Sequence, residues 1–109
     1  MRPRRAEPLK RLVDADPMWS GVHADPVRHG MGVIFECPIH TDCWVHVPFR
    51  NCIDGGTPHS PERALWDRTG EDFETLTLSP SIRILGGEGG CEWHGFIKNG
   101  CFETCEDAR

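Results

Sequence analysis

Two short segments of the sequence carry a cysteine and a histidine three residues apart. Residues 37–43 read CPIHTDC, and residues 91–94 read CEWH. A tight turn can direct both side chains of such a pair at one ion, and zinc prefers four nitrogen or sulfur ligands in a tetrahedron. The two segments therefore predict one zinc site that ties together two distant bends of the chain.

The predicted metal ligands are Cys37, Cys91 and His94, together with either His40 or Cys43. Cys43 is the stronger ligand because it binds zinc as a thiolate, whereas His40 has the spacing that matches the second segment. A structural zinc that closes a long loop can contribute on the order of 10 kcal/mol to folding. A chain of 109 residues with 12 glycines and 9 prolines forms only a small core and gains from such help. We therefore expect the zinc to be structural.

The six cysteines are interpreted as metal ligands or free thiols because the sequence predicts a cytoplasmic protein. The N-terminal arginines are not followed by an apolar segment of the kind found in secretory signals. No apolar run reaches the roughly 18 residues that a membrane helix needs, so no membrane contact is expected. In a reducing compartment, clustered cysteines indicate metal binding more often than disulfides.

The elements that must position the two segments are mostly β-strands. Alternating apolar residues predict strands over 33–37 and 43–49, and the latter places Cys43, Val45, Val47 and Phe49 on one face. Further strands are predicted at 64–66, 75–78, 81–85, 93–98 and 101–104, with the last two joined by an Asn-Gly turn. Residues 1–30 hold four prolines and are interpreted as a loosely packed N-terminal arm. Residues 31–109 are expected to form a single small zinc-stabilised β domain.

Several of these segments together resemble a known family. The resemblance is carried by Cys-Pro at 37–38, by the TLSPSI segment at 77–82 and by the CEWHGFIKNG segment at 91–100. The pattern is similar to a family of small phage, prophage and bacterial proteins of unknown function, some of which lie beside genes of bacterial ubiquitin-like conjugation systems. The resemblance implies a zinc-binding β-rich fold with Cys37, Cys91 and His94 at the metal positions. It implies no established activity.

The function expected from these observations is a non-enzymatic zinc module of phage or mobile-element type that binds a protein partner. No catalytic residues are predicted: Ser79 and Ser81 are interpreted as satisfying backbone groups beside Pro80, because the sequence shows no adjacent base and acid. One alternative is a zinc-dependent hydrolase in which Glu92 or Asp42 acts as the base. A zinc module that binds nucleic acid is a weaker alternative, because the net charge of −5 opposes contact with phosphates.

Overall fold

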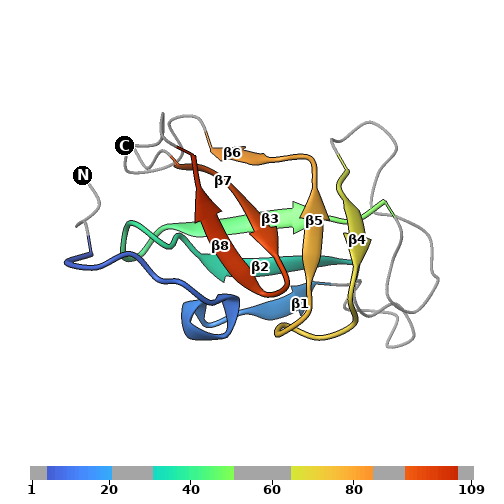
Figure 1. Ribbon diagram of the computed structural model, residues 1–109, viewed down its shortest axis with the longest axis horizontal. Helices are drawn as coiled ribbons and strands as arrows, with labels where there is room; N and C mark the ends of the chain where they lie inside the picture. The colour runs from blue at the N-terminus through green and yellow to red at the C-terminus, as the bar shows by residue number, and fades with distance from the viewer. Residues whose placement is uncertain (1–4, 21–30, 51–64, 85–92, 106–109) are drawn as a thin grey trace.

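The computed structural model describes residues 5–20, 31–50, 65–84 and 93–105. Within these ranges the chain forms one short 3-10 helix and eight strands, drawn in Figure 1. Their bounds are η1 (Leu12–Ala15), β1 (Met18–Ser20), β2 (Gly32–Glu36), β3 (Trp44–Pro48), β4 (Asp67–Thr69), β5 (Thr77–Ser79), β6 (Ile82–Ile84), β7 (Trp93–Lys98) and β8 (Cys101–Thr104). The prediction of a mostly β protein is confirmed.

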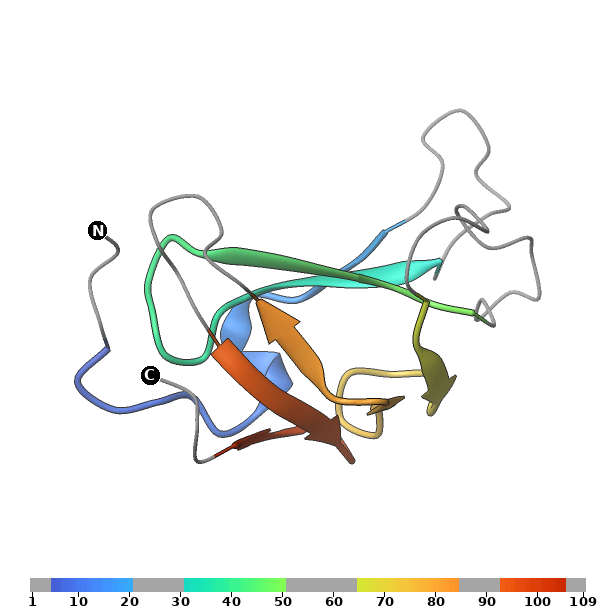
Figure 2. The same ribbon diagram turned by 90° about the horizontal axis from the view of Figure 1, so that it is seen from above.

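The strands form three small antiparallel sheets. Their strand orders are β1-β2-β3, β4-β5 and β6-β7-β8. Figure 1 shows β7 and β8 crossing in front of β2 and β3, and in Figure 2, seen from above, the two three-stranded sheets lie in separate layers. The core lies between these layers, because each sheet turns its apolar face toward the other.

Alternation along the strands explains which side chains fill the core. Val45 and Val47 of β3 are buried, whereas Trp44 and His46 between them point outward. On the opposing sheet, Trp93 of β7 is buried, and its ring meets that of Phe35 edge to face with 6.2 Å between the centroids. The side chains predicted to share one face of residues 43–49 are therefore the ones that point into the core, because successive side chains of a strand alternate between its two faces.

The segment before β2 differs from the loosely packed arm expected for residues 1–30. Leu12 and Ala15, three positions apart on η1, are both buried in the core. The helix and the strand after it are both bonded to the rest of the fold. The N–H of Leu12, the first residue of the helix, donates to the Gly100 carbonyl at 2.8 Å, and Met18 pairs with Ile34 in the β1-β2 register. The prolines suggested a loop, but residues 5–20 bury apolar side chains and complete a sheet. Residues 21–30 lie outside the described part of the chain.

The hairpin of β7 and β8 agrees with its prediction in both strands and in the turn. Asn99 and Gly100 both have positive φ, 48° and 71°, which a two-residue hairpin turn of this kind requires. The strand expected over 81–85 is present as the shorter β6, which pairs with β7 so that Arg83 lies opposite His94. This register positions the candidate site.

Candidate active site

A serine and a histidine meet on the outward face of the β6-β7-β8 sheet. The Oγ atom of Ser81 lies 3.0 Å from Nε2 of His94, and both residues are half-buried. The register places Arg83 opposite His94, so Ser81, two residues before Arg83, projects from the same face and reaches His94 diagonally. Ile82, between them, points the other way into the core.

Hydrogen bonds from neighbouring elements fix the backbone of both residues. The indole Nε1 of Trp66 donates to the Ser81 carbonyl at 3.2 Å. The backbone N–H of Cys105 donates to the His94 carbonyl at 2.8 Å, and His94 lies on β7, the middle strand of its sheet. His94 is therefore held within β7 and Ser81 directly before the first residue of β6, which limits the freedom of the pair to separate.

A hydroxyl at this distance from an imidazole nitrogen has the geometry of an activated nucleophile. The imidazole accepts the hydroxyl proton as the oxygen attacks an electrophilic carbon, and the required separation is about 2.6–3.2 Å. Sequence reasoning missed this pair, because it interpreted Ser81 as structural and His94 as a metal ligand. The available signal was alternation: Ser81 and Arg83 share one face of β6, and His94 faces the same way on the next strand along the chain.

A second serine–histidine contact has a structural explanation. The Oγ atom of Ser20 lies 3.0 Å from Nε2 of His46, and Ser20 is only 9% exposed. Its hydroxyl sits directly against Gly32, where an added Cβ would come within 2.6 Å of Oγ. Ser20 therefore fills the space above a glycine between β1 and β3, and a buried hydroxyl in that position has little access to a substrate.

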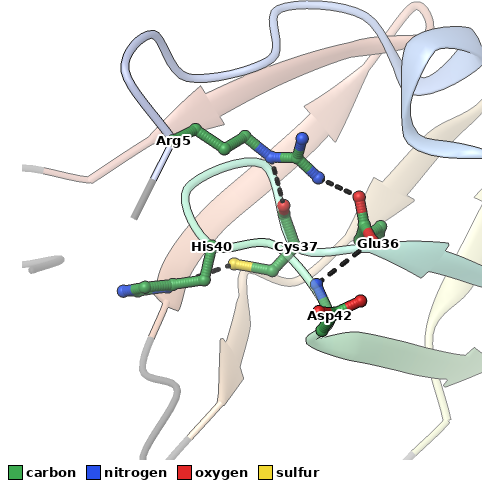
Figure 3. A network of polar contacts seen from close by, with 5 residues as sticks. All are labelled: Arg5, Glu36, Cys37, His40 and Asp42. Carbon is green, nitrogen blue, oxygen red and sulfur yellow. Dashed lines mark hydrogen bonds and ion pairs between the residues drawn. The ribbon is translucent and has the colours of Figure 1, made fainter. Parts of the chain in front are cut away.

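The first predicted metal segment forms the turn between β2 and β3, shown in Figure 3. Cys37 Sγ lies 3.7 Å from His40 Nδ1, close to the separation of about 3.6 Å that sulfur and nitrogen have around a tetrahedral zinc ion. Among the ranges that the structure describes, no three side chains of His, Cys, Asp or Glu are grouped to hold a metal ion. Cys91 lies outside those ranges, so zinc binding stays a prediction.

Two of the other predicted ligands, Cys43 and His94, are bonded to other residues in this structure. Cys43 takes part in a disulfide bond, which differs from the reduced thiol expected. The choice between His40 and Cys43 as a zinc ligand stays a prediction. Nε2 of His94 lies 3.0 Å from Ser81 Oγ, and a metal ion on the other ring nitrogen would keep a proton on Nε2, so His94 serves either as a zinc ligand or as a base toward Ser81.

Charged groups surround the Cys37 turn. Arg5 forms an ion pair with Glu36 and donates to the Cys37 carbonyl at 3.2 Å, and Glu36 accepts from the Asp42 backbone N–H at 3.2 Å (Figure 3). Burial raises the pKa of the Cys37 thiol, an effect opposed by hydrogen bonds from the backbone amides of Ile39 and His40. In the absence of a metal this thiol is therefore neutral and weakly nucleophilic near pH 7.

A cleft of about 310 Å³ lies beside the two residues that follow Ser81, Ile82 and Arg83. It is lined by Trp44, Val45, His46, Val47, Trp66, Ile82 and Arg83. A second cleft, of about 450 Å³, is lined by charged and apolar residues between positions 7 and 14, which include no nucleophile. Of these two clefts, the one bordered by β3 and β6 is the one whose lining includes a residue bonded to Ser81, since Trp66 donates to the Ser81 carbonyl.

A protein-family model matches most of the chain. The sequence model of a family described as "Bacterial ubiquitination-like system serine protease (BubE)" matches residues 7–105, which is most of the chain. No curated protein and no solved structure matches. Within the described residues, no helix has the length and apolar character needed to cross a membrane.

Proposed function

The chain belongs to the family of bacterial ubiquitination-like system serine proteases, and we propose that it is itself a peptidase with Ser81 as nucleophile and His94 as general base. The observation that carries the proposal is the 3.0 Å contact between Ser81 Oγ and His94 Nε2. Both residues also belong to the segments, 77–82 and 91–100, on which the family resemblance was drawn.

The proposed reaction follows from the positions of these two side chains. Ser81 Oγ attacks the carbonyl carbon of a peptide bond while His94 Nε2 takes the hydroxyl proton. The imidazolium then gives this proton to the leaving nitrogen, the C–N bond breaks, and an ester to Ser81 remains. A water molecule, deprotonated by the same nitrogen, hydrolyses that ester and restores the serine.

The family match corrects the function expected from the sequence. A non-enzymatic zinc module was expected, and the description of the family as a serine protease contradicts that expectation. The alternative of a hydrolase fits better, but the nucleophile is a serine and not a zinc-bound water. Asp42, one of the two bases then considered, is an exposed turn residue with a φ of 57°, and Glu92 lies outside the described residues.

The expected association with bacterial ubiquitin-like conjugation is supported by the same match, whereas a phage origin gains no support from it. The family description points to protein partners, and we propose that the partner is the substrate, a protein of the same conjugation system. A cytoplasmic location, where such a substrate would be made, remains part of the proposal.

Labelling with a small fluorophosphonate tests the proposed nucleophile. Such a probe loses fluoride when a serine oxygen attacks phosphorus, so it reports nucleophilic reactivity without knowledge of the substrate. We expect a single adduct on Ser81 by peptide mass spectrometry, no adduct on Ser81→Ala, and full labelling of Ser20→Ala.

Two outcomes would contradict this proposal. One is an adduct on Ser20 that survives in Ser81→Ala. The other is the absence of any adduct together with a peptidase activity that a chelator removes while the protein stays folded, because a zinc hydrolase behaves in that way.

A further inference from the structure

The cleft beside Ser81 is bordered by two tryptophans from different parts of the chain. Trp44 lies on β3 and points outward, and 52% of its surface is exposed. Trp66 also lines the cleft and is half-buried. Binding clefts are usually lined by apolar and aromatic side chains, so an exposed indole on a cleft wall is available to contact a ligand.

This cleft lies next to the backbone of the reactive serine. Trp66, which lines the cleft, donates its indole N–H to the Ser81 carbonyl at 3.2 Å. Ile82 and Arg83, the two residues that follow Ser81, also line it. A peptide whose scissile carbonyl lies at Ser81 Oγ can therefore reach the cleft with a side chain next to the scissile bond.

The size and lining of the cleft limit what it can hold. About 310 Å³ is near the lower end of the range for ligand pockets, which suits one or two side chains of an extended peptide and excludes a folded domain. Five of its seven lining residues are apolar, and the two indoles among them offer a leucine, methionine or phenylalanine side chain more contact area than a small one; His46 and Arg83 are the polar members of the lining.

We infer that the cleft between Trp44 and Trp66 is the specificity subsite of the enzyme, and that it takes a large apolar side chain next to the scissile bond. This inference rests on the proposed function, since it assumes that Ser81 is the nucleophile. Trp44 is then a specificity-determining residue that contacts the substrate without taking part in proton transfer.

A pair of covalent probes tests the subsite separately from the nucleophile. Two peptidyl diphenyl phosphonates are compared, identical except for a leucine-type or an alanine-type side chain next to phosphorus, together with the small fluorophosphonate, which carries no peptide. We expect the leucine-type probe to label Ser81 about tenfold or more faster than the alanine-type probe. In Trp44→Ala this preference, taken as the ratio of the two peptidyl rates measured in that variant, should fall to within about twofold.

Met18→Ala is the matched control, because Met18 is 53% exposed and lies on β1, the strand at the other edge of that sheet. It should keep the full preference for the leucine-type probe. Equal rates for the two peptidyl probes in the unaltered protein, or a preference that survives in Trp44→Ala, would overturn the inference while leaving Ser81 as the nucleophile. Failure of the fluorophosphonate to label Ser81 would instead overturn the proposed function, and the subsite with it.

Discussion

At the scale of single residues, the proposed chemistry depends on one contact between side chains that are 13 positions apart, Ser81 and His94. A serine hydroxyl is a poor nucleophile on its own and becomes reactive when a base removes its proton during attack. The half-buried imidazole is in place to do this.

Substitution of His94 should therefore slow the reaction of Ser81 with the probe, while Ser81 itself remains able to react. We expect His94→Ala to lower the rate of fluorophosphonate labelling at Ser81 by about 10²- to 10⁴-fold, the usual contribution of a general base. Circular dichroism should show the same strand content as in the unaltered protein. Cys105→Ala is the control, since Cys105 contacts His94 only through its backbone N–H in the hydrogen bond described, and alanine keeps that group. A labelling rate that is unchanged in His94→Ala would exclude His94 as the base.

Residue types alone gave a partial picture of this site. The spacing of Cys37 and His40 predicts that both side chains lie in one turn, where Sγ and Nδ1 are 3.7 Å apart, and their binding of one metal ion stays a prediction. The partner of His94 was not predictable in the same way. It depends on the register between β6 and β7, and four serines in the chain offered no local reason to select Ser81.

At the scale of secondary-structure elements, the loop before β6 must hold Ser81 at one position along β7. The hydrogen bond from Trp66 to the Ser81 carbonyl does this from outside the sheet. Trp66 in turn is held by β3, since its backbone N–H donates to the Pro48 carbonyl at 3.0 Å.

Trp66→Phe should remove this hydrogen bond and keep the aromatic wall of the cleft. A neutral hydrogen bond is worth about 0.5–1.5 kcal/mol, so we expect labelling by the small fluorophosphonate to slow by about three- to tenfold. The preference for the leucine-type peptidyl probe should remain. If Trp66 serves stability only, the melting temperature will fall and the labelling rate at 25 °C will not.

Gly95 follows His94 on β7 and allows two neighbours to approach closely. A Cβ at this position would lie 2.5 Å from the Glu103 carbonyl oxygen and 2.6 Å from the Trp93 ring. Gly95→Ala should therefore push β7 and β8 apart and lower the free energy of unfolding by about 1–3 kcal/mol in urea titrations. Thr69→Ala, on the exposed face of β4, should change it by less than about 0.5 kcal/mol.

The strands were predictable where their signals are local. β7, β8 and the turn between them follow from alternation and from Asn99-Gly100. The segment 5–20 was not, because Leu12 and Ala15 are buried only once β2 and β8 are in place, and nothing within the segment reveals those partners.

At the scale of the whole molecule, two small layers enclose a core of 15 buried residues among those described. Such a core gains from a cross-link, which was the reason for expecting a structural metal. The family assignment changes the expected function and leaves the metal untested.

We expect protein purified under reducing conditions to contain about one zinc per chain, because with His94 as the proposed base the other four predicted ligands, Cys37, His40, Cys43 and Cys91, still suffice for a tetrahedral site. A chelator or Cys37→Ser should then remove the metal and lower the melting temperature by several degrees, because structural zinc contributes directly to folding. Cys101→Ser is the control, since Cys101 is exposed on β8. Metal-free protein with a melting temperature that chelation does not change would end the zinc hypothesis.

The arrangement of the site has a consequence for how such a protein can diverge. His94 and the residue before β6, Ser81, belong to one sheet, whereas the indole of Trp44 comes from the other sheet. The proposed chemistry and the proposed selectivity are thus encoded in separate stretches of the gene. If both proposals hold, a substitution at position 44 changes the preferred substrate and leaves Ser81 and His94 in place.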